Sequence, residues 1–255
     1  MTGFSSFLKL NNIRQFGESK EGLLQYGKAL REAKKDIQLL VKPQLWVRDG
    51  KYTGHIKMDS ETSWKTFENS YSTFILEHAK TAQELNAELF CIGTELEYFV
   101  KMRPEYWKKL IVKIRTVFKG KLTYVANWDE YKRVEFWSDL DFIGIDAYFP
   151  LTHKKNPSIE DFESGWKIHK KEMIQIQKKF NIPVVFTEFG YRSIDFTGKQ
   201  PWDSKIEKEG VNLQAQVNGL QAIYNQFWHE DWFKGGYVWK WFLDHNTVGG
   251  TENNR

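Results

Sequence analysis

The sequence predicts an α/β fold, specifically a (β/α)8 TIM barrel that is incomplete at its N-terminus and at its C-terminus. Apolar runs alternate with amphipathic helical patterns along almost the whole 255-residue chain. Such strand–helix units with apolar strands indicate a parallel sheet covered by helices. Polar and aromatic residues also collect at the carboxyl ends of several runs, which suits a barrel, where all strand ends share one mouth. The alternative, an open doubly wound sheet, usually has a glycine-rich turn after its first strand, and this sequence has none.

The first third of the chain contains three candidate strands and two candidate helices. FSSFLKL (4–10) is a short apolar run that we interpret as a strand, and apolar residues recur at helical spacing over 23–35. IQLLVKPQLWV (37–47) is a continuous apolar run, as expected of a strand buried on both faces. The helical pattern over 64–82 is longer, and it leads into LFCIGT (89–94), another buried strand.

The remainder of the chain repeats the same alternation without interruption. In order, we expect a helix over 106–117, strands over 121–128 and 141–149, a helix over 162–180, a strand over 183–188, a helix over 213–227 and a strand over 235–242. Each helix has one apolar face, and each strand is a nearly unbroken apolar run.

The number of strands falls short of a closed barrel. Six runs are strong strand candidates and 4–10 is a seventh, whereas a barrel needs eight. Only about 36 residues precede the run at 37–47, which leaves room for one strand and one helix. The last strand is followed by HNTVGGTENNR, with no closing helix. We therefore expect a chain clipped at both ends that forms one domain over 1–255.

Composition excludes several classes of protein. The net charge is +4 and the lysines lie on helical faces such as 107–121, so no concentrated basic patch predicts nucleic-acid binding. The single cysteine, Cys91, excludes an intramolecular disulfide and a cysteine-based zinc site. Because the six histidines are scattered, we expect no metal, and no other cofactor is predicted.

The sequence predicts no membrane-spanning helix, and its first residues do not resemble a signal peptide. Its apolar runs all stay below the roughly 18 residues that a membrane helix requires. The start, MTGFSSFLKL, lacks the basic and apolar regions of a signal peptide. Since the N-terminus looks clipped, the compartment stays open, and we expect the chain to be a monomer.

Two glutamates at the ends of buried strands are the main candidate catalytic residues. Thr94-Glu95 closes the run at 89–94, and Thr187-Glu188 closes the run at 183–188. A carboxylate there is costly unless it forms an ion pair or faces a polar site. In an eight-stranded barrel these two strand ends lie across the mouth from each other, and two carboxyl groups about 5 Å apart are typical of retaining glycosidases. Glu97 is the alternative to Glu95.

The chemistry of a retaining glycosidase gives the two carboxyl groups different roles. One must be ionised to attack the sugar, and the other must hold a proton to assist the leaving group. Tyr148, one strand before Glu188, is placed to donate a hydrogen bond to it. Tryptophan and phenylalanine are abundant, at 11 and 19 residues, and serve either as core or as flat platforms for sugar rings.

Six ordered motifs carry a family resemblance. LLVKPQLWV, FCIGTELE, LTYVANW, FIGIDAYFPL, FTEFGYRS and GGYVWKWF resemble the strand ends of glycoside hydrolase family 113, a family of (β/α)8-barrel β-mannanases. The resemblance extends from about Phe16 to Arg255 and implies that Glu95 is the acid/base and Glu188 the nucleophile. It further implies a substrate cleft lined by Trp46, Asn127, Trp128, Asp146, Tyr148, Arg192, Trp239 and Trp241.

The chain departs from the family pattern in two respects. Thr94 stands where the clan commonly has asparagine, so the contact to the sugar 2-hydroxyl is expected from another group. Family members also have a first strand upstream, which we expect to be missing here, and they continue past the equivalent of Asn253, Asn254 and Arg255. The long loop over 193–210 carries Trp202, which either binds substrate or packs on the barrel edge.

The sequence thus predicts an endo-acting β-1,4-mannanase that cleaves polysaccharide or oligosaccharide substrates by double displacement. The same machinery acting on another β-linked glycan is the first alternative, because fold and catalytic pair do not determine the sugar. A non-catalytic glycan-binding barrel fragment is the second, because an open barrel would expose strand edges.

Overall fold

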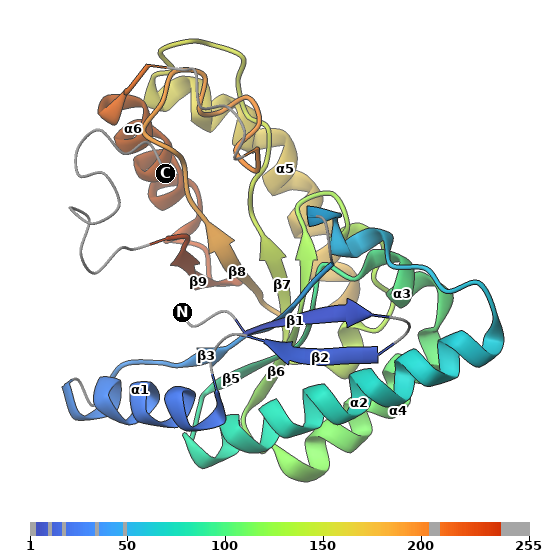
Figure 1. The fold of residues 1–255 in the computed structure, drawn as a ribbon. Helices are drawn as coiled ribbons and strands as arrows, with labels where there is room; N and C mark the ends of the chain where they lie inside the picture. Colours follow the sequence, from blue (N-terminus) through green and yellow to red (C-terminus); the bar gives the residue numbers. More distant parts are fainter. Residues whose placement is uncertain are drawn as a thin grey trace. The chain divides into compact units, whose positions relative to one another are not determined.

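A computed structural model of the chain describes residues 4–9, 12–16, 19–33, 36–47, 50–203 and 210–240, with backbone only over 4–9 and 12–16. The chain divides into two compact units. The first comprises Met1–Ala126 and Arg133–Ile143, and the second comprises Asn127–Lys132 and Gly144–Arg255. Both are built of strands and helices in alternation, as Figure 1 shows. The expectation of a single domain over 1–255 stays a prediction.

The first unit contains a parallel sheet whose central strand is entirely buried. β3 (Leu40–Val41) pairs with β5 (Leu89–Thr94), and β5 pairs with β6 (Lys121–Asn127), both in parallel. The start of β7 (Phe142–Asp146) also belongs to this unit. All six residues of β5 are buried, as the apolar run predicted.

Four helices complete the first unit. α1 (Lys20–Ala33) and α2 (Glu61–Glu84) precede β5, whereas α3 (Glu97–Met102) and α4 (Pro104–Val117) follow it. α2 begins at Ser60, whose side chain accepts from the backbone N–H of Ser63. α2 and α4 lie side by side (Figure 1), and a Cβ at Gly93 would lie within 3 Å of side chains from both, Tyr71 and Trp107.

The predicted strand over 37–47 is wrong in one respect, because the run forms two strands in two sheets. Lys42 interrupts the strand after β3. The next strand, β4 (Pro43–Trp46), belongs to a three-stranded sheet of order β2-β1-β4. Pro43 has no backbone N–H, so it cannot continue the ladder that β3 makes with β5.

The N-terminal residues hold one strand more than expected. β1 (Phe4–Lys9) pairs antiparallel with β2 (Asn12–Phe16) and parallel with β4. The run at 4–10 is therefore a strand as predicted, but β2 was not predicted. Two strands and α1 precede β3, where one strand and one helix were expected.

The second unit contains the end of β7, β8 (Val184–Phe189) and β9 (Phe233–Val238), with α5 (Ile159–Phe180) and α6 (Leu213–Phe227). β8 and β9 are parallel, and α5 and α6 lie side by side (Figure 1). β9 ends earlier than the predicted strand over 235–242, whose last two residues lie outside the described residues.

Local signals explain where α5 begins and ends. Ser158 and Asp161 form a reciprocal capping box at its start. Asn181, in the left-handed conformation with φ 53°, ends it. The buried face of the helix packs into an aromatic core, in which Trp166 stacks on Phe186 with ring centroids 5.9 Å apart.

Asp141, just before β7, carries a pH-dependent part of the stability. Its carboxylate accepts from the Leu122 N–H at 2.8 Å and pairs with Arg115 at 3.0 Å and Lys121 at 3.2 Å. Burial alone would raise the pKa of Asp141, but these partners hold the pKa below its ordinary value of 3.8. Because the folded pKa lies below the unfolded one, this stabilisation is present at neutral pH and is lost as pH falls through the lowered pKa.

Substitution of Asp141 by asparagine is expected to lower the free energy of unfolding at pH 7 by about 1–2 kcal/mol. The difference from the wild type should shrink as the pH falls through the lowered pKa of the wild-type carboxyl. Urea unfolding at pH 3, 4, 5 and 7 measures it, with Asp36→Asn as an exposed control. A loss of equal size at pH 3 and pH 7 would contradict the assignment.

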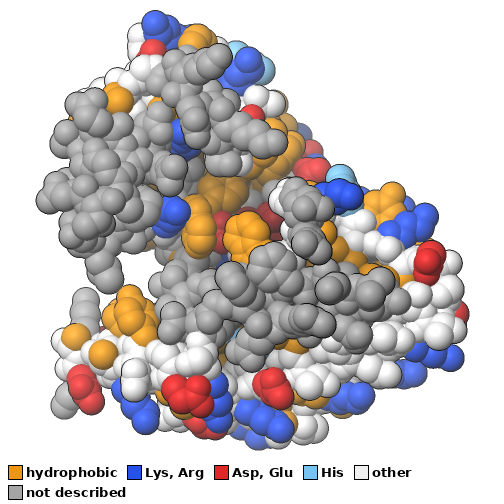
Figure 2. All heavy atoms as spheres, viewed as in Figure 1, with side chains coloured by type: hydrophobic (Ala, Val, Ile, Leu, Met, Phe, Trp, Pro, Cys, Tyr) orange, Lys and Arg blue, Asp and Glu red, His pale blue; other side chains and the backbone are white. Residues whose placement is uncertain are grey.

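The described surface shows no segregation of charge on the face drawn in Figure 2. Over α1 and α2, acidic and basic side chains are interspersed, in keeping with solvated helix faces. Within the part of the chain that the structure describes, no helix combines the length and the apolar character needed to span a membrane.

Candidate active site

Glu188 lies near the carboxyl end of β8, where it is buried and its carboxylate is hydrogen-bonded. Its side chain is only 8% exposed, and its Oε2 accepts a hydrogen bond of 2.8 Å from Tyr148 Oη. The backbone carbonyl of Glu188 also accepts from the Ala147 N–H at 2.7 Å. The end of β8 is thereby joined to the residues that follow β7, and the hydrogen bond predicted for Tyr148 is present.

The threonine before Glu188 has a structural partner of its own. Thr187 Oγ1 donates to Asp146 Oδ1 at 2.8 Å, and both side chains are buried. Since side chains alternate along a strand, Thr187 and Glu188 face opposite sides of β8. The Asp146 carboxylate therefore ties β7 to β8, while the Glu188 carboxylate binds Tyr148.

The glycine after β8 is required by a close approach of the backbone. A Cβ at Gly190 would lie 2.3 Å from the carbonyl oxygen of Trp239. The Trp239 N–H in turn donates to the Phe189 carbonyl at 2.8 Å. Any side chain at position 190 would force these two segments apart.

Asn127 ends β6 and Trp128 begins the turn after it, which a buried carboxylate stabilises. Glu130 Oε2 accepts from the Asn127 N–H at 3.0 Å, and Asn127 Oδ1 accepts from the Trp128 N–H at 2.8 Å. Glu130 is buried, and it was not predicted from the sequence. Its signal was an acidic residue three positions beyond a strand end, which is common in turns and points to no particular role.

Trp202 meets Trp128 in a parallel stack, with ring centroids 5.2 Å apart and an interplanar angle of 21°. Its loop is anchored by the bridge between Ile194 and Val211 and by the Leu151 N–H, which donates to the Gly198 carbonyl. Trp202 nevertheless stays 43% exposed.

Arg192 belongs to the same loop region. Its Nη1 donates to the Asp203 carbonyl at 3.3 Å, one residue beyond Trp202. The structure thus associates three predicted site residues, Trp128, Arg192 and Trp202, within the second unit.

Glu95 belongs to the first unit and directly follows β5. It is half-buried, with a positive φ of 49°, and its N–H donates to the Val125 carbonyl at 2.8 Å. The strand ends at Thr94, so Glu97, the alternative to Glu95, does not lie on it. Glu97 instead begins α3 and forms an ion pair with Arg133 at 2.6 Å. Thr94 Oγ1 donates to the Pro43 carbonyl at 3.1 Å, which gives this hydroxyl a structural role.

The remaining predicted residues are tryptophans near strand ends. Trp46 ends β4 in the first unit and is 49% exposed. Trp239 comes one residue after β9 in the second unit, and the Lys240 ammonium lies 5.7 Å from its ring centroid. Trp241 lies outside the described residues.

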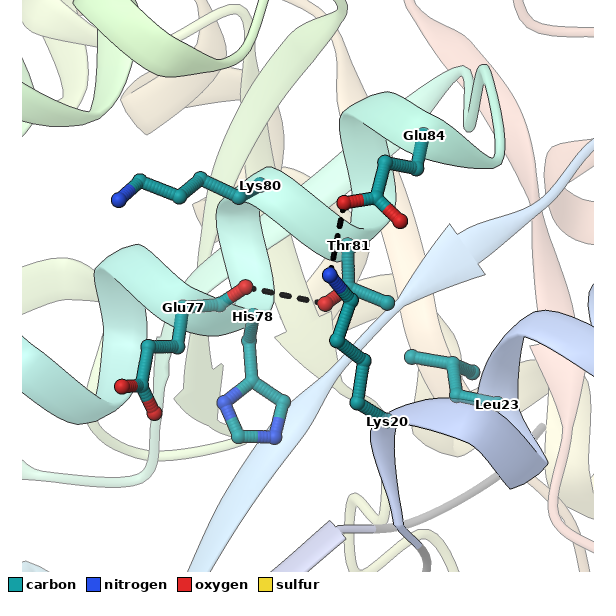
Figure 3. A pocket seen from close by; sticks show the side chains of 7 residues that line it. All are labelled: Lys20, Leu23, Glu77, His78, Lys80, Thr81 and Glu84. Atoms are coloured by element: carbon teal, nitrogen blue, oxygen red, sulfur yellow. Dashed lines mark hydrogen bonds and ion pairs between the residues drawn. The ribbon is translucent and has the colours of Figure 1, made fainter.

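Among the described residues, neither a metal-binding cluster nor the pocket between α1 and α2 involves the predicted site residues. Across the described residues, no group of three or more His, Cys, Asp or Glu side chains could hold a metal ion. A pocket of about 370 Å³ lies between α1 and α2, where Lys20 reaches Glu84 at 2.8 Å (Figure 3). None of the predicted site residues lines it.

Comparisons with known proteins agree with this fold. A sequence model of Glycoside Hydrolase Family 113 matches residues 25–254. The chain is similar to the solved family 113 β-mannanase AaManA from Alicyclobacillus acidocaldarius in complex with ManMIm: 24% identity, TM-score 0.83, covering 98% of this chain and 79% of that one. A complex structure of a family 113 β-1,4-mannanase is similar at 21% identity with a TM-score of 0.85. That match covers 99% of this chain and 80% of the other.

A more distant likeness connects the chain to other barrel glycosidases. A structure of fungal β-1,4-galactanases matches at 14% identity with a TM-score of 0.61, covering 92% of this chain and 77% of that one. At these identities the structural matches establish the fold alone, and they confirm the predicted (β/α)8-type architecture. A comparison with curated proteins finds no match.

Proposed function

Because the chain belongs to Glycoside Hydrolase Family 113, and is therefore a glycoside hydrolase with a carbohydrate substrate, we propose that it is a retaining endo-β-1,4-mannanase. The buried Glu188 carboxylate, bound by Tyr148 Oη at 2.8 Å near the end of a barrel strand, is the observation that supports this most directly. Similarity to solved β-mannanases favours mannan as the polysaccharide.

The proposed reaction is a double displacement. Glu188 attacks carbon 1 of a mannosyl unit while Glu95 protonates the departing glycosidic oxygen, which leaves a covalent glycosyl-enzyme. Glu95 then takes a proton from water, and the resulting hydroxide equivalent releases the sugar with its original configuration. The hydrogen bond from Tyr148 orients the carboxylate of Glu188 for attack.

Aromatic rings at the strand ends are assigned to substrate binding. Trp202 is 43% exposed and stacks on Trp128, an arrangement that suits packing against the C–H face of a pyranose. Trp46 and Trp239 are exposed at the ends of β4 and β9 and are assigned the same role. Arg192 and Asn127 are assigned to holding the segments that carry Trp202 and Trp128, because each has a hydrogen bond within them. Asp146 accepts a hydrogen bond from Thr187 and is assigned to holding the ends of β7 and β8 beside Glu188.

Substitution of Tyr148 by phenylalanine is expected to lower kcat/KM on mannan by about 10- to 100-fold. A hydrogen bond to a charged group contributes about 1.5–3 kcal/mol, and this one orients the nucleophile. The measurement is initial-rate kinetics, with Tyr224→Phe on α6 as an exposed tyrosine control in the same unit. An unchanged kcat/KM would mean that the Tyr148 hydroxyl has no part in the reaction.

The proposed function is tested by reducing-sugar release from soluble β-1,4-mannan, with a β-1,4-glucan and a xylan beside it. Mannan-selective release supports the proposal. Faster release from glucan or xylan would mean that the same catalytic residues act on another β-linked glycan. A folded chain that binds mannan on affinity gels without cleaving it would instead be a glycan-binding barrel, and circular dichroism establishes that the protein is folded.

A further inference from the structure

The backbone at Glu95 adopts a conformation that needs support from its neighbours. Its φ of 49° lies in the left-handed region, which residues with side chains rarely occupy outside turns. Such conformations persist where the surroundings determine them, and they are frequent at functional sites. The groups that bind the peptide units on either side of Glu95 therefore decide where its carboxyl group lies.

Three hydrogen bonds fix these peptide units. The Glu95 N–H donates to the Val125 carbonyl at 2.8 Å, and the next N–H, of Leu96, donates to Tyr124 Oη at 2.6 Å. Both acceptors belong to β6. The carbonyl of Glu95 accepts from Thr53 Oγ1 at 3.1 Å, so this third contact comes from a different part of the chain.

Thr53 is itself held firmly. It begins η2 (Thr53–His55), a short 3₁₀ turn after β4, and it is 7% exposed. The His55 N–H donates to the Tyr52 carbonyl at 3.2 Å, and the Ile56 N–H donates to the Thr53 carbonyl at 3.1 Å. η2 also contacts α3, the helix that follows Glu95. The Thr53 hydroxyl therefore approaches Glu95 from a well-ordered turn.

We propose that Thr53 is a positioning residue for Glu95. Through the Glu95 carbonyl it sets the direction in which the carboxyl group leaves the strand end, and so the alignment of proton delivery to the glycosidic oxygen. A general acid acts only within hydrogen-bonding reach of its target, and a misplacement of about 1 Å costs about 100-fold in rate. The inference rests on the proposed function, in which Glu95 is the acid/base.

The test compares two substrates that differ in their need for a proton. Mannan has a poor leaving group that must be protonated, whereas a dinitrophenyl β-mannobioside has a leaving group that departs as an anion. The quantity measured is kcat/KM, because it reports the glycosylation step for both substrates. Thr53→Val removes the hydroxyl at nearly constant shape, and Thr53→Ser restores it.

Thr81 provides a matched control in the same unit. It is 4% exposed, and its Oγ1 donates to the Glu77 carbonyl at 3.0 Å, on α2 beside the pocket of Figure 3. Thr81→Val therefore removes a similarly buried threonine hydroxyl bound to a backbone carbonyl, but one whose hydrogen bond lies within α2 and not at Glu95. Circular dichroism and Tm accompany every variant, and Thr53→Ala is the second hydroxyl-free variant in case valine prevents folding.

We expect Thr53→Val to lower kcat/KM on mannan by about 10- to 100-fold and on the aryl glycoside by less than about 3-fold. Thr53→Ser should recover to within about 3-fold of the wild type, and Thr81→Val should change neither rate. Equal losses on both substrates, or no loss on mannan, would overturn the proposal.

Glu95→Ala, measured beside these variants, separates this inference from the assignment on which it rests. If Glu95→Ala loses activity on mannan far more than on the aryl glycoside while Thr53→Val does not, only the role of Thr53 is wrong. If Glu95→Ala affects both substrates alike, the acid/base assignment fails, and the Thr53 proposal fails with it.

Discussion

Replacement of Glu188 by alanine is expected to lower kcat on β-1,4-mannan by at least about 1000-fold, because no other group can take its place as nucleophile. In the proposed reaction the buried carboxylate, held by its hydrogen bond from Tyr148, attacks the sugar with one oxygen. Without it no covalent glycosyl-enzyme forms. Reducing-sugar release and binding to mannan on affinity gels measure the effect, and binding is expected to remain.

Added azide tests whether the Glu188→Ala variant has lost the nucleophilic step. With the aryl β-mannobioside as substrate, azide should enter the space left by the missing carboxylate and give an α-configured glycosyl azide. The control is Glu163→Ala, which removes a glutamate hydrogen-bonded to Asn225 at 2.8 Å in the same unit. If Glu188→Ala kept wild-type turnover, the nucleophile assignment would be wrong.

Replacement of Glu95 by alanine is expected to lower kcat/KM on mannan by about 100- to 10,000-fold, the range that general acid catalysis supplies. The loss on the dinitrophenyl glycoside should be much smaller, because its leaving group needs no proton. Added azide should here give a product of retained, β configuration, since the covalent intermediate still forms on Glu188.

Glu97 is the control that the structure itself provides. It lies two residues from Glu95 but forms an ion pair with Arg133 at the start of α3. An exposed ion pair contributes little to stability, so Glu97→Ala should keep activity within about 3-fold of the wild type. If activity fell in Glu97→Ala and not in Glu95→Ala, Glu97 would be the acid/base in place of Glu95.

The ends of several buried strands could be predicted from the sequence, because the residues change there abruptly from apolar to polar. The contact between Tyr148 and Glu188 follows from two strand ends that are neighbours in a parallel sheet, and the structure contains it. The extents of β5 and α6 also agree with their patterns, because apolar periodicity there is uninterrupted. The roles of the two glutamates stay predictions.

The features that the sequence did not predict have no periodic signal. The break between β3 and β4 depends on a single proline inside an apolar run. α3 has only six residues and η2 only three, too few for a repeat to be recognised. Thr53 and Glu130 act through contacts with backbone groups, which any polar residue can make, so their importance is visible only in three dimensions.

The stacked indoles of Trp128 and Trp202 also have a spectroscopic consequence. Two rings with centroids 5.2 Å apart and an interplanar angle of 21° lie close enough for their electronic transitions to interact. The size of this effect depends on the distance and the angle between the rings. A change in the position of the loop before Asp203 should therefore alter the circular dichroism of the chain, which can be recorded without a label.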